Sequence, residues 1–214
     1  TTEIYTLSLH DALPICDAML HEIHHRVKNN LQIIASMLNL QAASARSAET
    51  IAAFARSYNR LQAIAVVHDD ALDRFRADRV DVLCLIRRIA ASLASSMTDD
   101  VHPDMRFEGD SLEVGMDAAL PIALIASEVL HNALTHAFRG KTAGSVAVRI
   151  RKSADSALVL EISDDGLGIP AASLHRRGLG LSLVEALVLQ LRGRHTVARP
   201  PEGGTMFRLE APLE

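Results

Sequence analysis

The first long stretch of the chain repeats its apolar residues at the period of an α-helix. In residues 17 to about 43 they recur every three or four positions, with no glycine or proline between them. Residues 51–72 repeat this spacing after a short polar segment, 44–49. The pattern predicts two helices in an antiparallel hairpin. Because each apolar stripe needs a cover, the same hairpin of a second chain is the expected partner, giving a dimeric four-helix bundle.

After residue 78 the pattern changes to shorter, mixed elements. The predicted helices are 80–97, 118–137 and 181–191, and the predicted strands are 105–108, 112–115, 145–152, 158–163 and 205–211. We expect strands 105–108 and 112–115 to flank a Gly-Asp turn, and strands 145–152 and 158–163 to form a hairpin. Pro121 is expected in the first turn of its helix, where proline is tolerated. Helices on one side of a mixed or antiparallel sheet make an α+β sandwich of two layers.

Composition and charge exclude several classes of protein. The 214 residues are 49% hydrophobic and 22% charged, which suits a folded core. The net charge is −4 and no long basic tract is present, so we expect no nucleic-acid binding. We find no apolar run near the ~18 residues of a membrane span. Cys16 and Cys84 make no disulfide framework, and we expect Cys84 to be buried in a helix.

The N-terminal segment is treated apart from the fold. Residues 1–15 read as the in-frame translation of a sequencing-adapter oligonucleotide, so segment 1–16 is set aside as an artefact or linker. The gene is expected to continue upstream. The rest divides into residues 17–78 and 79–214. We expect a cytoplasmic fragment without membrane contact, whose parent protein can still be anchored in a membrane upstream.

A polar segment, HHRVKNN, interrupts the first helix at residues 24–30. His25 lies about 160° around the helix from Val27, so we expect it to face solvent. Glu22 lies three residues earlier on the same face and is our hypothesis for a base that orients the ring. An imidazole held by a carboxylate keeps its other nitrogen nucleophilic, as phosphoryl acceptance requires. The alternative is a solvated helix face of mixed charge.

A second group of residues predicts a nucleotide site. Glu128 and Asn132 are four residues apart on one helix face, where an amide oxygen suits Mg²⁺ and a carboxylate can hold or polarise water. Asp164 follows a predicted strand, and its carboxylate can accept from the amino group of adenine. Gly166 and Gly168 then let the backbone approach the base.

Two more glycine clusters follow in the sequence. Gly178 and Gly180 open the last helix, whose free amides and positive dipole end suit phosphate. Gly203, Gly204 and Thr205 form a tight turn before the last strand. One such cluster is weak, because loops are rich in glycine, but the order and spacing of all of them point to ATP and Mg²⁺.

These motifs together resemble the sensor histidine kinases whose acceptor helix carries H-R-V-K-N, the HisKA_2 type. The second half also resembles the GHKL (Bergerat, HATPase_c) ATP-binding fold of gyrase, Hsp90 and MutL. The resemblance covers residues 19–212. It implies an α-helical hairpin for dimerisation and histidine phosphotransfer at 17–78, followed by an α+β two-layer catalytic ATP-binding domain at 79–214.

The resemblance also implies a role for each motif. His25 is the implied phosphoacceptor, Glu128 belongs to the N box as a catalytic residue, and Asn132 is the implied Mg²⁺ ligand. The other implied cofactor-binding residues are Asp164, Gly166, Gly168, Gly178, Gly180 and Thr205. Thr135 departs from the family, which usually has a phosphate-binding lysine there; Arg176 and Arg177 are candidates to replace it.

The resemblance implies an ATP-dependent protein-histidine kinase of two-component signal transduction. As a homodimer it would phosphorylate His25 and pass the group to an aspartate of a response-regulator receiver domain. A GHKL-type ATPase or an anti-sigma-like serine kinase is one alternative, and it would lack the H-R-V-K-N helix. A degenerate nucleotide-binding dimeric scaffold is the other, and only Thr135 favours it.

Overall fold

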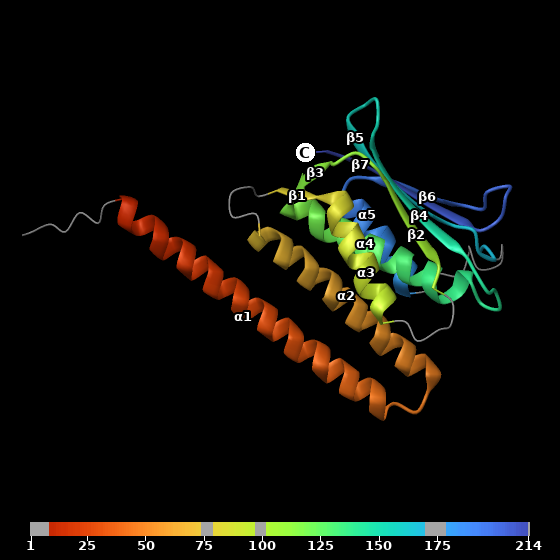
Figure 1. The fold of residues 1–214 in the computed structure, drawn as a ribbon, viewed down its shortest axis with the longest axis horizontal. Helices are drawn as coiled ribbons and strands as arrows, with labels where there is room; N and C mark the ends of the chain where they lie inside the picture. The colour runs from red at the N-terminus through yellow and green to blue at the C-terminus, as the bar shows by residue number, and fades with distance from the viewer. Residues whose placement is uncertain (1–8, 74–78, 97–101, 170–178, 214) are drawn as a thin grey trace, which may run out of the picture.

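The computed structural model describes residues 9–73, 79–96, 102–169 and 179–213, and it shows a long helical hairpin beside an α/β unit (Figure 1). The hairpin consists of α1 (Leu9–Ser44) and α2 (Ala48–Asp73), as the apolar period predicts. α1 extends through residues 9–16, eight residues before its predicted start. The assignment of segment 1–16 as an artefact or linker stays a prediction.

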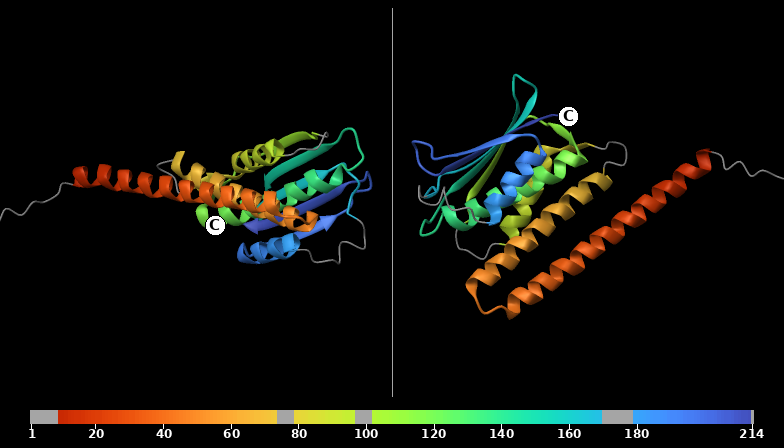
Figure 2. Two further views of the ribbon diagram at one scale, coloured as in Figure 1. Left: turned by 90° about the horizontal axis from the view of Figure 1, so that it is seen from below. Right: turned by 180° about the vertical axis from the view of Figure 1, so that it is seen from behind.

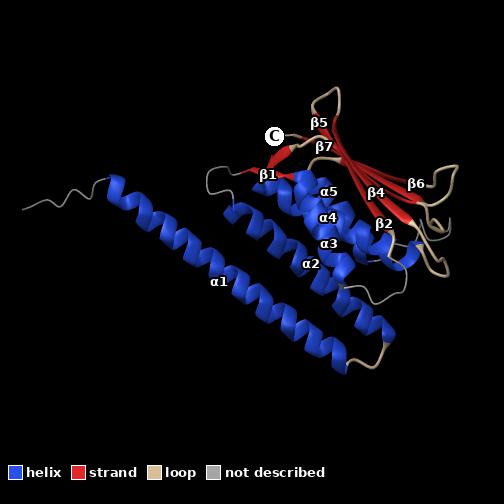
Figure 3. Ribbon diagram, in the orientation of Figure 1, coloured by secondary structure: helices blue, strands red, loops and turns tan. Residues whose placement is uncertain are grey.

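The α/β unit is a sheet with helices on one face (Figure 3). Its elements are β1 (Arg79–Asp81), α3 (Val82–Ser95), β2 (Asp104–Gly109), β3 (Glu113–Gly115), α4 (Met116–Asn132), a π-helical turn η1 (Ala133–Ala137), β4 (Ser145–Lys152), β5 (Ala157–Asp164), α5 (Leu179–Gln190), β6 (Arg194–Ala198) and β7 (Thr205–Pro212). The main sheet has the order β2-β4-β5-β7-β6, and β1 pairs with β3 separately. The predicted two-layer α+β sandwich is therefore confirmed.

The sequence predicts two strands around the Gly-Asp turn but not how they pair. The two strands flanking the Gly-Asp turn form, but they do not pair with each other. β2 runs parallel to β4, whereas β3 runs antiparallel to β1. β4 and β5 form the predicted antiparallel hairpin. The edge strand β6 was not predicted, because its five residues include only one large apolar side chain, Val197.

The helix predicted at 80–97 is wrong at its start. Val80 belongs to β1, and Asp81 caps α3 by accepting from the backbone N–H of Cys84 at 2.7 Å. Cys84 is exposed rather than buried. The buried positions of α3 follow a helical period that leaves residue 84 out: Val82, Leu85, Ile86, Ile89, Ala90 and Leu93.

α4 is the central helix of the fold. It begins at Met116, so Pro121 lies in its second turn and not in the first. Met116–Ala137 is long and apolar enough to cross a membrane by length and composition, which corrects the expectation of no such run. However, 61% of its most apolar window is buried in this fold, as in the core helix of a soluble protein.

The hairpin packs onto the α/β unit through α2. Ala63 and Val67 of α2 are each 1% exposed and belong to the same core as α4 and the sheet. α2 lies between α1 and α4 in Figure 1 and in the right-hand view of Figure 2. Most of the apolar stripe of α2 is therefore covered within the chain. Apolar side chains in the half of the hairpin toward its turn stay exposed, four on α1 and one at the start of α2: Ile33, Ile34, Met37, Leu40 and Ile51.

Candidate active site

Adjacent ends of β5 and β7 bring two of the predicted motifs together. Asp164 pairs in register with Thr205. Its Oδ1 accepts from the backbone N–H of Gly166 at 2.9 Å, and Thr205 adds backbone and side-chain hydrogen bonds. Gly204 has φ +76°, and a Cβ there would lie 1.8 Å from the carbonyl oxygen of Asp164. Only glycine fits this close approach.

The Asp164 carboxylate is half-buried, and its protonation reflects this. Burial raises its pKa above the usual value of an aspartate, while hydrogen bonds from Gly166 and Thr205 partly oppose the rise. A carboxylate of this kind, with limited access to water, is a strong acceptor for an amino group such as that of adenine.

The neighbouring Asp165 has a structural role. Its carboxylate accepts from the backbone N–H of Ser145 at 2.8 Å and from the Ser145 hydroxyl at 2.7 Å. Lys141 Nζ donates to the Asp165 carbonyl oxygen at 2.6 Å. Although desolvation acts in the opposite direction, the bonds from Ser145 lower the pKa of Asp165. These contacts tie the loop after β5 to the start of β4, and spacing alone did not predict them.

The loop after Asp164 rests on the turn that follows the N box. The backbone N–H of Leu167 donates to the Ala137 carbonyl at 2.8 Å, and a Cβ at Gly166 would lie 2.4 Å from that oxygen. η1 begins directly after Asn132, which is exposed at the end of α4. The segment predicted to bind adenine (Asp164, Gly166 and Gly168, here called the adenine motif) and the N box thus meet across η1. Thr135, the departure from the family pattern, also lies in η1.

Glu128 is buried between α2 and α5. Its side chain is 3% exposed, and Oε1 accepts from Arg60 Nε at 2.6 Å. Oε2 is buried with no hydrogen-bond partner among the described residues. A Cβ at Gly180, in the first turn of α5, would lie 2.6 Å from Oε2. Glu128 and Gly180 are therefore in contact, whereas Gly178 falls outside the described residues, as do Arg176 and Arg177.

These groups fit a nucleotide that carries Mg²⁺. Mg²⁺ prefers oxygen ligands and keeps waters and phosphate oxygens in its shell, so it needs few protein ligands. The exposed amide of Asn132 offers such a ligand, and Glu128 Oε2, which has no hydrogen-bond partner among the described residues, can hold a water. Gly180 leaves backbone rather than side chain at the N-terminus of α5, where phosphate is favoured.

Side chains are described for only part of the predicted acceptor segment, residues 24–30. His25 lies within α1, but its side chain is outside the described part, so its predicted exposure stays a prediction. Glu22 is exposed, and its Oε1 accepts from Arg26 Nε at 2.8 Å. Lys28 Nζ donates to Asp69 Oδ2 at 3.0 Å, which joins the segment to α2. Glu22 as the orienting base also stays a prediction.

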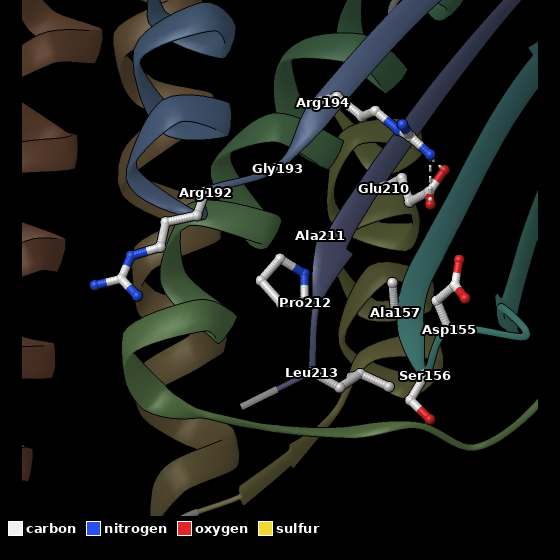
Figure 4. A pocket seen from close by; sticks show the side chains of 10 residues that line it. All are labelled: Asp155, Ser156, Ala157, Arg192, Gly193, Arg194, Glu210, Ala211, Pro212 and Leu213. Atoms are coloured by element: carbon white, nitrogen blue, oxygen red, sulfur yellow. Dashed lines mark hydrogen bonds and ion pairs between the residues drawn. The ribbon is translucent and has the colours of Figure 1, made fainter.

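A hollow at the other end of the sheet contains none of the predicted site residues (Figure 4). It is lined by residues 155–157, 192–194 and 210–213. Arg194 and Glu210 form an ion pair at 2.9 Å inside it. Since residue 155 precedes β5 and Asp164 ends it, the hollow lies a full strand away from the adenine motif.

Two families of known domains match the chain. Residues 22–97 match HisKA_2, described as "Histidine kinase". Residues 118–214 match HATPase_c, described as "Histidine kinase-, DNA gyrase B-, and HSP90-like ATPase". The first match includes His25 and all of α2, and the second includes Glu128, Asn132 and Asp164.

Individual relatives agree with these matches. Sensor histidine kinase PdtaS of Mycobacterium tuberculosis (strain CDC 1551 / Oshkosh) is 37% identical over 92% of this chain. Blue-light-activated histidine kinase 2 of Erythrobacter litoralis (strain HTCC2594) is 30% identical over 92%. This chain spans 40% and 58% of their respective lengths. The solved histidine kinase domain of the Erythrobacter litoralis EL346 blue-light activated kinase has a TM-score of 0.64 at 27% identity, covering 95% of this chain and 94% of that one.

Proposed function

Because this chain belongs to the sensor histidine kinases of the HisKA_2 type, we propose that it transfers the γ-phosphoryl group of ATP to His25. The group then passes to an aspartate of a response-regulator receiver domain. One observation carries the proposal: Asp164 pairs with Thr205, and the loop that follows Asp164 contacts η1 at the end of α4, the helix whose Glu128 contacts Gly180. Acidic, amide and glycine groups of the kind that bind a nucleotide thus lie along one continuous path.

Each residue of this path has a distinct task in the proposed reaction. The Asp164 carboxylate accepts from the adenine amino group, and Gly166 and Gly168 keep the backbone close to the base. The Asn132 amide oxygen would hold Mg²⁺ near the phosphates. Bound Mg²⁺-ATP supplies the phosphoryl group. Catalysis then depends mainly on positioning and charge, since phosphoryl transfer asks for little covalent chemistry from the protein.

Two different observations argue against the two alternatives. A GHKL-type ATPase or a serine kinase needs no acceptor helix, yet that match includes the H-R-V-K-N segment. A degenerate scaffold has no reason to keep Glu128 buried beside Gly180, with one carboxylate oxygen that has no hydrogen-bond partner among the described residues, because such burial is costly without a ligand.

Incubation with γ-labelled ATP and Mg²⁺ tests the proposal. We expect an acid-labile label on the wild-type chain, lost in His25→Ala and retained in His24→Ala, the matched neighbour. An acid-stable label would favour a serine kinase, and the absence of label from folded protein would favour the scaffold. Transfer from the labelled chain to a receiver domain then tests the second step.

We further propose that the chain acts as a homodimer through the hairpin. Support comes from the apolar side chains in the half of the hairpin toward its turn, which the rest of the chain leaves exposed: Ile33, Ile34, Met37, Leu40 and Ile51 are 44% to 72% exposed. A second hairpin placed against them would bury this surface and complete a four-helix bundle.

A further inference from the structure

A buried ion pair joins the helical hairpin to the nucleotide-binding unit. Arg60 of α2 donates through Nε to Glu128 Oε1 of α4 at 2.6 Å. The arginine is 29% exposed and the carboxylate 3% exposed. A carboxylate this deeply buried is costly unless a cation is paired with it. α2 therefore supplies the charge that balances an acidic residue of the other unit.

A second polar contact joins α2 to α4 beside this ion pair, but it involves no carboxylate. Asn59 Nδ2 lies 3.0 Å from His131 Nδ1, one residue before Arg60 on α2. Burial lowers the pKa of His131, which favours the neutral ring that accepts such a bond. Asn59 and Arg60 thus both fasten α2 to α4, but only Arg60 contacts a carboxylate that also borders α5.

The ion pair also determines which way Glu128 faces. A carboxylate is planar, so a bond that fixes one oxygen fixes the direction of the other. With Oε1 held by Arg60, Oε2 lies where a Cβ at Gly180 would come within 2.6 Å. This second oxygen is buried and has no hydrogen-bond partner among the described residues. It is thus held toward the start of α5 by a residue of the hairpin.

We propose that Arg60 is a positioning residue of the nucleotide site: through its bond to Oε1 it holds Glu128 Oε2 toward Gly180. The inference rests on the proposed function only in taking Glu128 to line that site. It follows that the geometry of the nucleotide site depends on how α2 sits on α4. A shift of the hairpin would change the rate of phosphoryl transfer without altering any residue that touches the nucleotide.

Kinetics of the full chain test this role with Arg60→Ala, Arg60→Lys and, as matched control, Asn59→Ala. We expect Arg60→Ala to lower kcat of autophosphorylation about tenfold or more, since small misplacements in a site are costly. The KM for ATP should change by less than about threefold, because Glu128 is not assigned a contact with the base or ribose. Arg60→Lys should recover most of the rate, and Asn59→Ala should stay near wild type.

Several results would overturn the inference. They are an unchanged or faster rate in Arg60→Ala, an effect on KM alone, and equal losses in Arg60→Ala and Asn59→Ala, which would indicate helix docking only. If Arg60→Ala does not fold, Arg60→Gln is compared in wild-type and Glu128→Gln backgrounds. The inference requires Arg60→Gln to lower the rate of autophosphorylation in the wild-type background and to leave it unchanged in the Glu128→Gln background.

The same assay separates this inference from the proposed function. A labelled wild-type chain with an unaltered Arg60→Ala rate contradicts the role of Arg60 and leaves the kinase proposal standing. A folded wild-type chain that takes up no label contradicts the kinase proposal, and the positioning role falls with it.

Discussion

At the scale of single residues, two adjacent aspartates at the end of β5 face different neighbours. Successive side chains of an extended strand point to opposite sides. Asp164 turns toward Gly166 and Thr205, whereas Asp165 turns toward Ser145. One carboxylate is therefore left beside the glycine-rich backbone, and the other holds the loop in place.

Because the two carboxylates have different partners, we expect the same substitution to lower nucleotide affinity at Asp164 and stability at Asp165. Asp164→Asn should weaken binding of a fluorescent ATP analogue roughly tenfold to a hundredfold, since bonds to charged groups contribute about 1.5–3 kcal/mol. Asp165→Asn should leave affinity nearly unchanged and lower the melting temperature, because it loses bonds to Ser145. Equal losses of affinity in the two variants would contradict the assignment of Asp164 to the base.

The affinity for adenosine should depend on pH through the protonation of Asp164. Burial raises its pKa, so on acidification the carboxylate takes up its proton at a higher pH than an ordinary aspartate does. Since the charged form is the better acceptor, affinity for adenosine should fall as pH drops through that raised value. The ratio of wild-type to Asp164→Asn affinity, measured by calorimetry, isolates the effect. A ratio that stays constant with pH would contradict it.

At the scale of elements, the turn before β7 is held against the end of β5. Gly203 and Gly204 both have positive φ, but only Gly204 is crowded by the Asp164 carbonyl. The position of Asp164, the proposed partner of adenine, therefore depends on backbone contact between the turn at Gly204 and the end of β5.

This crowding predicts unequal effects at two adjacent glycines. Gly204→Ala should destabilise the chain by more than the roughly 1–2 kcal/mol that a left-handed conformation costs an ordinary residue, and nucleotide affinity should fall with it. Gly203→Ala meets nothing within 4 Å and should cost only the conformational part. Urea denaturation compares the two. A loss in Gly203→Ala as large as that in Gly204→Ala would contradict the role of the contact.

The sequence predicted those elements that bury one continuous face. α1 and α2 show a long helical period and β4 and β5 an alternating one, so α2, β4 and β5 were located within a few residues, whereas α1 begins eight residues before its predicted start. β1 has three residues and β6 five, too few for alternation to be recognised. The pairing of β2 with β4 depends on segments about 40 residues apart, which no local pattern encodes.

The same limit applies to the site. Asp164, Gly166 and Thr205 were predictable because each stands at a strand end with a recognisable neighbour sequence, and β5 pairs with β7. The contact of Arg60 with Glu128 could not be predicted, because it joins two helices whose residues are 68 positions apart in the sequence. The packing of α2 on α4 has no signal in the period of either helix.

At the scale of the whole molecule, α2 links α1, the helix of the proposed acceptor His25, to the nucleotide unit. It is in contact with α1 on one side and with α3 and α4 on the other (Figure 2). Asp69 of α2 accepts from Lys28 of α1, and Arg88 of α3 lies 3.8 Å from the same oxygen. Within one chain, therefore, α2 stands between the helix of His25 and the helix of Glu128.

The exposed apolar side chains in the half of the hairpin toward its turn predict the assembly. Met37→Glu combined with Leu40→Glu places two charges where the residues are 58% and 72% exposed. We expect the wild-type chain to sediment as a dimer and the double variant as a folded monomer. Gln41→Glu, at an exposed polar position of α1, is the matched control and should remain dimeric. A dimer that survives the double variant would place the interface elsewhere.

The most direct test of the kinase assignment is to locate the phosphate. After incubation with Mg²⁺-ATP, peptides are prepared at neutral to alkaline pH and fragmented by mass spectrometry. We predict a phosphoramidate on His25, present in the wild-type chain and absent from Asp164→Asn at ATP concentrations that saturate only the wild type. Phosphate on a serine, or on any histidine other than His25, would contradict the assignment.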